Sequence, residues 1–218
     1  MGRLPIKHYK QVIDFDYMIQ TKEDLYRFLE MDKKAMRIPK QTIKRKIANF
    51  FNPHEIWKFV RLLRFAEYYS NCKSKNPFFR VYKIIMTLYY KYRLKKQSLR
   101  LGFSIPINTC GPVLSIAHHG TIVINASTRI GANCRIHACV NIGASAGKKE
   151  APVIGDNCYI GPGAIIFGGI HIADNTTIGA NATVNKSFDT PNVIIAGTPA
   201  KIVKENTPNW LEFNGLMA

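Results

Sequence analysis

Four histidines in the second half of the chain are the side chains there best suited to moving a proton: His118, His119, His137 and His171. The unperturbed pKa of histidine, about 6.5, lets an imidazole take up or release a proton near neutral pH. His118 and His119 are adjacent, so one of them can pack or cap a turn while the other does chemistry. His137 is either a substrate contact or a polar corner residue, and we expect His171 to lie simply on the surface.

The cysteines and histidines do not form a metal-binding pattern. The five cysteines are odd in number and contain no CxxC pair, and the histidines lack the spacing of zinc ligands. No metal is therefore expected. Cys134 and Cys158 occupy positions where a thiol acts as a compact apolar filler. We expect all five thiols to be reduced, as in a cytosolic protein.

A repeat indicates what must hold the histidines in place. An aliphatic residue recurs every six positions, with one twelve-residue step that keeps the phase. Neither an amphipathic helix, with a period of about 3.6, nor a single strand, with a period of about 2, keeps that spacing. We call these residues the repeat aliphatics: Ile124, Ile130, Ile136, Ile142, Ile154, Ile160, Ile166, Ile172, Ile178 and Val184.

The positions around the repeat aliphatics follow the same period. The fourth residue after each is small or β-branched, and the next residue is often Gly or Asn. This pattern predicts a parallel β-helix, in which short strands stack along a prism and the aliphatics fill its axis. Three hexapeptides make one turn, so we expect about five turns between Pro106 and Ile194. Residues 144–151 carry no aliphatic in phase, which predicts a loop that leaves the prism.

The first half of the chain is predicted to be helical. Apolar stripes and starting residues indicate helices near residues 23–33, 54–71 and 78–99, the first with Thr21 and Asp24 in a capping pattern. The fold class is therefore mainly β, a β-helix preceded by an α-helical region. We divide the chain into a basic helical region (1–101), a β-helix domain (102–204) and a C-terminal tail (205–218).

Positive charge is concentrated in the first half. Residues 1–100 carry a net charge of +16, whereas residues 101–218 carry +1. Such a balance calls for a polyanion or an anionic surface. Nucleic acid is disfavoured because no recognised binding motif is present. Residues 78–100 interleave aromatic and basic side chains, which suits a helix lying on anionic lipid. The alternative is a helical cap with its apolar face on the β-helix and a solvated basic face.

Neither a signal peptide nor a membrane-spanning segment is expected. The first residues lack an apolar core, and the longest strongly apolar run, near Ile84, is far shorter than the roughly 20 residues that a spanning helix needs. We therefore expect a cytoplasmic protein. A basic surface would allow it to bind peripherally to the inner face of the cell membrane.

Several of these features together resemble a known family. The hexapeptide repeat, the turn at 118–121, the excursion after Ile142 and the closing segment 196–203 (Ala-Gly-Thr-Pro-Ala-Lys-Ile-Val) resemble the left-handed β-helix acyltransferases. The resemblance is closest to the serine acetyltransferase branch, especially the forms of bacterial polysaccharide synthesis, and covers roughly residues 102–204. It implies a homotrimer with active sites between neighbouring prisms and acetyl-CoA along the crevice.

The resemblance also implies roles for individual residues. His118 falls on the family's catalytic histidine, with His119 as the runner-up, and His119 and His137 are candidates for contact with the acceptor. Small residues would leave room for the pantetheine arm of acetyl-CoA beside the backbone, and Lys201 would meet a CoA phosphate. The candidate residues for binding acetyl-CoA are Gly143, Ala144, Gly163, Ala164, Ala180 and Lys201.

Three departures from the family concern the acceptor. The acid that precedes the catalytic histidine and helps to hold serine is Ala117 here, and a second acid that orients the imidazole is Phe103. The Arg-His-Pro segment that grips the serine carboxylate reads Glu150-Ala151-Pro152. Without the Arg, a carboxylate loses its planar two-donor clamp. We therefore expect a sugar hydroxyl of a surface-polysaccharide intermediate as the acceptor. The alternatives are serine and a non-catalytic β-helix scaffold or anion-binding module.

Overall fold

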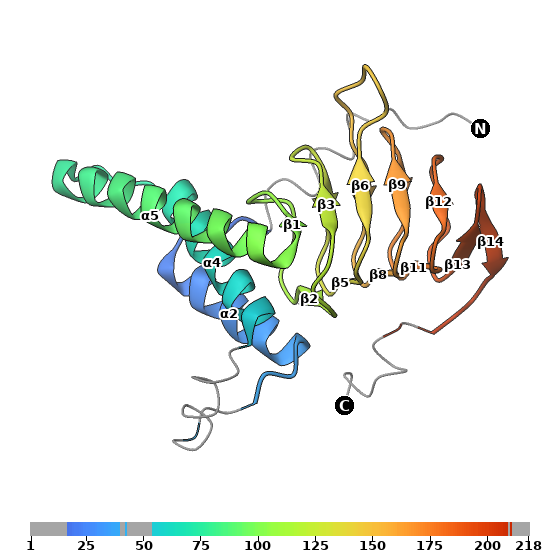
Figure 1. Ribbon diagram of the computed structural model, residues 1–218, viewed down its shortest axis with the longest axis horizontal. Helices are drawn as coiled ribbons and strands as arrows, with labels where there is room; N and C mark the ends of the chain where they lie inside the picture. The colour runs from blue at the N-terminus through green and yellow to red at the C-terminus, as the bar shows by residue number, and fades with distance from the viewer. Residues whose placement is uncertain (1–16, 40–41, 43–53, 209, 211–218) are drawn as a thin grey trace.

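The computed structural model describes residues 17–39, 42, 54–208 and 210, which form a helical part followed by a prism of short strands (Figure 1). The helices are α2 (Lys22–Ala35), α4 (Glu55–Asn71) and α5 (Pro77–Leu101). They agree with the predicted segments to within three residues at each end. Asn52 and Pro53, which precede the predicted second helix in the sequence, lie outside the described residues, as do residues 40, 41 and 43–46 of the basic stretch between the first two helices.

Side-chain caps set where the helices begin. Thr21 and Asp24 form the predicted capping box of α2. His54 Nδ1 accepts a hydrogen bond from the Trp57 backbone N–H at the start of α4. Asn76 accepts from two backbone N–H groups at the start of α5. Gly102, with φ at 78°, ends α5 in the left-handed conformation and turns the chain into the first strand.

The strands form three parallel sheets that make the faces of the prism. Sheet A contains β1 (Phe103–Ser104), β3 (Ile122–Ile124), β6 (Asn141–Gly143), β9 (Ile165–Phe167) and β12 (Thr183–Val184). Sheet B contains β4 (Arg129–Ile130), β7 (Val153–Ile154) and β10 (His171–Ile172). Sheet C contains β2 (Ser115–Ile116), β5 (Arg135–Ile136), β8 (Tyr159–Ile160), β11 (Thr177–Ile178), β13 (Ile194–Gly197) and β14 (Ala200–Lys204). The five strands of sheet A correspond to about five turns, and β14 closes the prism by pairing antiparallel with β13.

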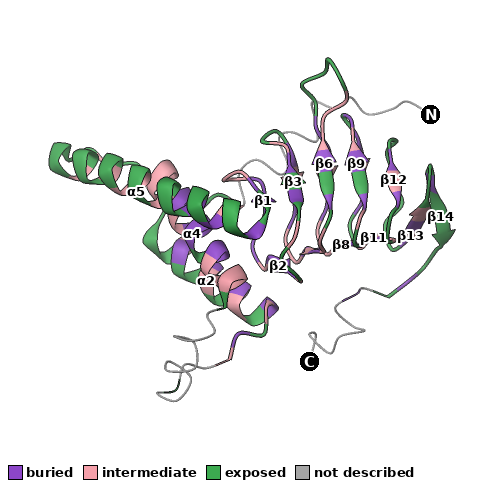
Figure 2. Cartoon of the chain, viewed as in Figure 1, coloured by how far each residue is buried: buried purple, intermediate pink, exposed green. Residues whose placement is uncertain are grey.

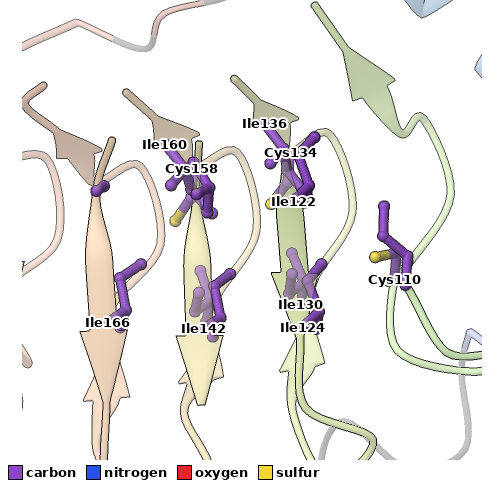
Figure 3. Close-up of a cluster of buried hydrophobic side chains, with 14 of the residues drawn as sticks. Cys110, Ile122, Ile124, Ile130, Cys134, Ile136, Ile142, Cys158, Ile160 and Ile166 are labelled. Atoms are coloured by element: carbon purple, nitrogen blue, oxygen red, sulfur yellow. The ribbon is translucent and has the colours of Figure 1, made fainter. Parts of the chain in front are cut away.

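The repeat aliphatics fill the axis of the prism, as the period predicts. All ten are at most 2% exposed, and they stack turn upon turn (Figure 3). The register keeps each aliphatic beside its equivalent on the next turn, as Ile136 pairs with Ile160. Full burial of one such side chain stabilises a fold by about 1.5–3 kcal/mol. The small residues four positions later are also buried, Cys134 and Cys158 among them.

Glycines that follow the repeat aliphatics are required by close approach between turns. A Cβ on Gly131 would lie 2.7 Å from the carbonyl carbon of Gly155, and one on Gly161 would lie 2.7 Å from the Ile178 carbonyl oxygen. The left-handed conformation occurs two residues further on, at Asn133 with φ at 56° and at equivalent positions. Stacking therefore selects glycine at one corner position, and backbone conformation selects Asn or Gly at another.

The helical part is joined to the first turn of the prism through buried contacts. Phe59 of α4 packs edge to face on Phe103 of β1, with ring centroids 5.0 Å apart. The Arg64 guanidinium, also from α4, donates hydrogen bonds to the Cys110 and Gly111 carbonyl oxygens in the first turn. The helices therefore cap one end of the prism, and α5 projects away from it (Figure 1).

The break in the repeat produces the predicted loop. Residues 144–152 separate β6 from β7 and extend from the prism, as Figure 1 shows. The Lys148 backbone N–H donates to the Ser145 carbonyl oxygen and makes a turn within the loop. None of the described helices combines the length and apolar character needed to span a bilayer.

Candidate functional site

The chemistry-bearing residues gather where the chain passes from sheet C to sheet A. We call residues 118–121, 137–140, 161–164 and 179–182, which make this passage on successive turns, the C–A corner. Backbone hydrogen bonds stack the segments: Gly163 N–H donates to Ala138 O at 3.0 Å, and Asn181 N–H donates to Pro162 O at 2.9 Å. Thr198, in the turn after β13, continues the column by donating its hydroxyl to Asn181 O.

Two of the four histidines meet at this corner. His118 follows β2 and His137 follows β5, and Ile116 pairs with Ile136 in the parallel register between these strands. The imidazole centroids of His118 and His137 are 6.0 Å apart, with a tilt of 55° between the rings. His118 is exposed, so that a proton donor in solution can reach its ring, whereas His137 is half-buried.

The environment of His137 favours its neutral form. Arg135 Nε donates to His137 Nε2 at 3.3 Å, which requires that nitrogen to be unprotonated. Burial lowers the pKa of His137, and the charges of Arg135 and His118 lower it further. A neutral His137 places no positive charge beside His118.

Three residues that sequence reasoning missed complete this surface. Arg135 and Tyr159 precede repeat aliphatics on consecutive turns of sheet C, and the Tyr159 ring lies 4.9 Å from that of His137. Trp210, which is 6% exposed, lies 6.4 Å from Tyr159, so the C-terminal segment reaches this face. The position before each aliphatic in sheet C could have indicated Arg135 and Tyr159, but nothing local indicates Trp210.

The remaining histidines lie in different surroundings. His119 is exposed on the turn after His118. His171 lies in sheet B, where its Nδ1 is 2.8 Å from Asp189 Oδ1. The structure therefore does not bring His171 to the C–A corner.

The residues predicted to hold acetyl-CoA are divided: some lie where strands of sheet A begin, others lie where a strand of sheet A ends, and Lys201 lies in sheet C. Gly163 and Ala180 lie on the C–A corner beside the histidines, and Lys201 is exposed on β14. Ala164 has no exposed surface, so its side chain fills the axis and only its backbone can take part. Gly143 and Ala144 lie at the other side of this face of the prism, where β6 ends and the 144–152 loop begins.

The three positions that depart from the family also have defined surroundings. Phe103, which stands where the family has an acid, is buried against Phe59 and belongs to the core. Ala117 is half-buried. Glu150 is exposed on the loop, whereas Ala151 and Pro152 are buried at its end. Among the residues that the structure describes, no group of three or more His, Cys, Asp or Glu side chains is placed to hold a metal ion.

Comparison with known proteins agrees with this architecture. Residues 151–186 match the family model "Bacterial transferase hexapeptide (six repeats)". A crystal structure of serine acetyltransferase from Brucella abortus superimposes with a TM-score of 0.63 at 23% identity, over 86% of this chain and 71% of that one. The same protein in complex with coenzyme A gives a TM-score of 0.61. The chain has the fold of the hexapeptide-repeat acyltransferases. The predicted left-handed β-helix with a preceding helical region is thereby confirmed.

Sequence relatives point to the same branch. The serine acetyltransferase of Mycobacterium tuberculosis is 33% identical over 101 residues, which cover 45% of this chain and 44% of that protein. The serine acetyltransferase of Staphylococcus xylosus is 29% identical over 197 residues, which cover 88% of this chain and 80% of that protein. The predicted resemblance to the serine acetyltransferase branch is confirmed, and with the mycobacterial protein it is confined to less than half of either chain.

Proposed function

We propose that this protein is an acetyl-CoA-dependent O-acetyltransferase in which His118 acts as the general base. The observation that carries the proposal is the meeting of His118 and His137 at one end of a column of small corner residues, on a fold shared with acetyltransferases. A non-catalytic scaffold would need no pair of histidines at this corner. Of the two candidate bases, His118 is favoured because its ring lies 6.0 Å from that of His137.

The proposed reaction is a direct transfer. The His118 imidazole takes the proton of an acceptor hydroxyl as that oxygen attacks the thioester carbonyl carbon. The tetrahedral intermediate collapses with cleavage of the C–S bond, and the departing thiolate of CoA takes the proton back from the imidazolium. A backbone N–H of the corner would stabilise the oxyanion in the intermediate.

The small residues of the C–A corner would bind the donor. Gly163 and Ala180 leave the backbone of successive turns accessible, so that an extended pantetheine arm could lie along the prism towards Lys201. The Lys201 ammonium would then meet a phosphate of CoA. The complex of the Brucella abortus relative with coenzyme A supports acetyl-CoA as the donor.

A homotrimer would unite residues that one chain keeps apart. Gly143 and Ala144 lie across sheet A from His118 and Gly163, so a single prism cannot bring them into one crevice. If neighbouring prisms pack with the 144–152 loop of one against the C–A corner of the next, the residues near the loop and those of the corner line the same crevice. Val123 and Ile165, which are exposed on the outer face of sheet A, would be covered by such packing.

The acceptor has two candidates. L-Serine is favoured by the comparisons, because the relatives of this chain carry that name. The saccharide hydroxyl expected from the sequence is retained on a specific observation: Ala117 and the buried Ala151 supply no charged group for an amino acid. A saccharide acceptor carried on lipid would also suit a cytoplasmic protein held at the inner face of the membrane by its basic helical region.

Release of free thiol from acetyl-CoA tests the proposal. The purified protein is assayed with L-serine and with a panel of sugars and nucleotide sugars, and the acetylated product is identified by mass spectrometry. We expect acceptor-dependent thiol release. Product with serine alone would rule out a saccharide acceptor, and product with a sugar alone would rule out serine. If no acceptor is turned over and acetyl-CoA does not bind, a non-catalytic scaffold is favoured.

A further inference from the structure

The outward face of α5 is apolar although it faces solvent. Among the described residues, large apolar side chains follow one another there at helical spacing, and Figure 2 shows the exposed face along the projecting helix. Phe78 is 85% exposed and Leu88 is 65% exposed. We call this set the α5 apolar face: Phe78, Val81, Ile85, Leu88, Tyr89 and Tyr92. The sequence pattern left open whether these residues would pack on the β-helix, and they do not.

The opposite side of α5 is the one that packs on α4. Tyr90 stacks on Phe65 with ring centroids 4.9 Å apart, and the Thr87 hydroxyl donates to the Tyr69 carbonyl oxygen. Leu94 and Leu101, near the C-terminal end, are buried. Because this side already anchors the helix, the α5 apolar face is not needed to hold α5 in place. Exposed apolar patches of such extent usually mark an interaction surface.

Basic side chains border the α5 apolar face. The 25 residues of α5 include seven Lys or Arg and no Asp or Glu. At 100° per residue, Lys95 falls beside Leu88 on one border and Arg93 falls beside Tyr89 on the other. The Arg93 guanidinium lies 5.5 Å from the Tyr89 ring centroid, and the Lys96 ammonium lies 5.9 Å from that of Tyr92. Both cations therefore lie close to aromatic rings of the α5 apolar face.

This combination of charge and apolar surface selects one partner. A second copy of α5 would bring its bordering cations against those of the first, and neither helix carries an acid to pair them, so self-association through this face is disfavoured. An anionic lipid surface offers phosphates to the bordering cations and acyl chains to the apolar side chains. The geometry points to docking of α5 on an anionic bilayer, with its axis along the surface and the α5 apolar face inserted among the lipid headgroups.

Vesicle co-sedimentation with the full-length protein tests this docking independently of acetyl transfer. The probes are vesicles of phosphatidylcholine alone and vesicles with about one third phosphatidylglycerol. We expect binding to the second and little to the first, weakened when the salt concentration is raised several-fold. In Ile85→Glu we expect the partition coefficient to fall at least about tenfold, through lost apolar area and added repulsion.

The matched control is Val203→Glu, which adds the same charge to an exposed apolar residue on β14. We expect this variant to bind as the wild type does. Equal binding to the two vesicle types, no binding to either, or equal losses in the two variants would overturn the proposal. Sedimentation velocity without lipid tests the competing explanation. If the wild type assembles and Ile85→Glu alone breaks up the assembly, the α5 apolar face is a contact between copies of the chain, and the lipid proposal is overturned.

Discussion

Arg64 of α4 and Asp32 of α2 form an ion pair of 2.8 Å in which neither side chain is exposed. The same Asp32 accepts a hydrogen bond from the Leu114 backbone N–H, and Arg64 also pairs with Glu67 at 2.9 Å. One buried cluster therefore holds two helices and the first turn of the prism together. Burial alone would lower the pKa of Arg64, but Asp32 and Glu67 raise it above its ordinary value.

The two acids of this cluster should not be equivalent. Burial raises the pKa of Glu67, and the charge of Arg64 offsets only part of that effect. Burial therefore already disfavours the charged form of Glu67, so that replacing Glu67 by a neutral residue removes a charge that is partly destabilised. Asp32→Asn instead leaves Arg64 without its closest counter-charge. By urea unfolding we expect Asp32→Asn to cost about 3–5 kcal/mol and Glu67→Gln clearly less. Similar losses for the two variants would contradict this order.

His118→Ala should lower the rate of acetyl transfer by roughly 10² or more, the usual effect of losing a general base. Circular dichroism and the sedimentation coefficient should stay unchanged, because the His118 side chain is exposed. His171→Ala, in sheet B, is the matched control and should retain activity. An inactive His119→Ala beside a nearly normal His118→Ala would transfer the role of base to His119.

His137 should titrate below the ordinary histidine pKa of about 6.5. Burial is the main cause, followed by Arg135, so Arg135→Met should move the pKa only part of the way back. Because the folded-state pKa is lowered, the folded protein binds fewer protons than the unfolded chain at acid pH. The stability from this residue is complete above about pH 6.5 and is lost as the pH falls through the lower folded value. NMR titration of the His137 ring protons measures the shift; an unchanged pKa in Arg135→Met would remove Arg135 as a cause.

The acceptor's carboxylate should contribute little to its recognition. Ala117 and Ala151 present no charged group, so L-serine and L-serinamide should be acetylated with kcat/KM values within about tenfold of each other. A two-donor clamp on the carboxylate would instead favour serine at least about a hundredfold, since each charged hydrogen bond is worth about 1.5–3 kcal/mol. Steady-state kinetics with the two acceptors decide between these outcomes, and a strong preference for serine would mean that another basic residue holds its carboxylate.

Local pattern was sufficient for the elements of this fold. The six-residue period predicted the prism because one aliphatic per strand must reach the axis, and the capping pattern of Thr21 and Asp24 predicted where α2 begins. The small residues after each aliphatic followed from the same repeat. These features depend on neighbours in sequence or on a constant spacing, and the sequence alone shows either of them.

Contacts between distant segments were decided only by the tertiary structure. His118 and His137 meet because parallel register places successive turns beside each other, and Trp210 reaches Tyr159 from a tail with no repeat at all. The pairing of Arg64 with Asp32 joins two helices whose sequences contain no signal for each other. The period of α5 predicts an apolar face, but a period does not say what that face packs against. Only the arrangement of α4 and the prism leaves it exposed, because the other side of the helix already provides the contacts that hold it.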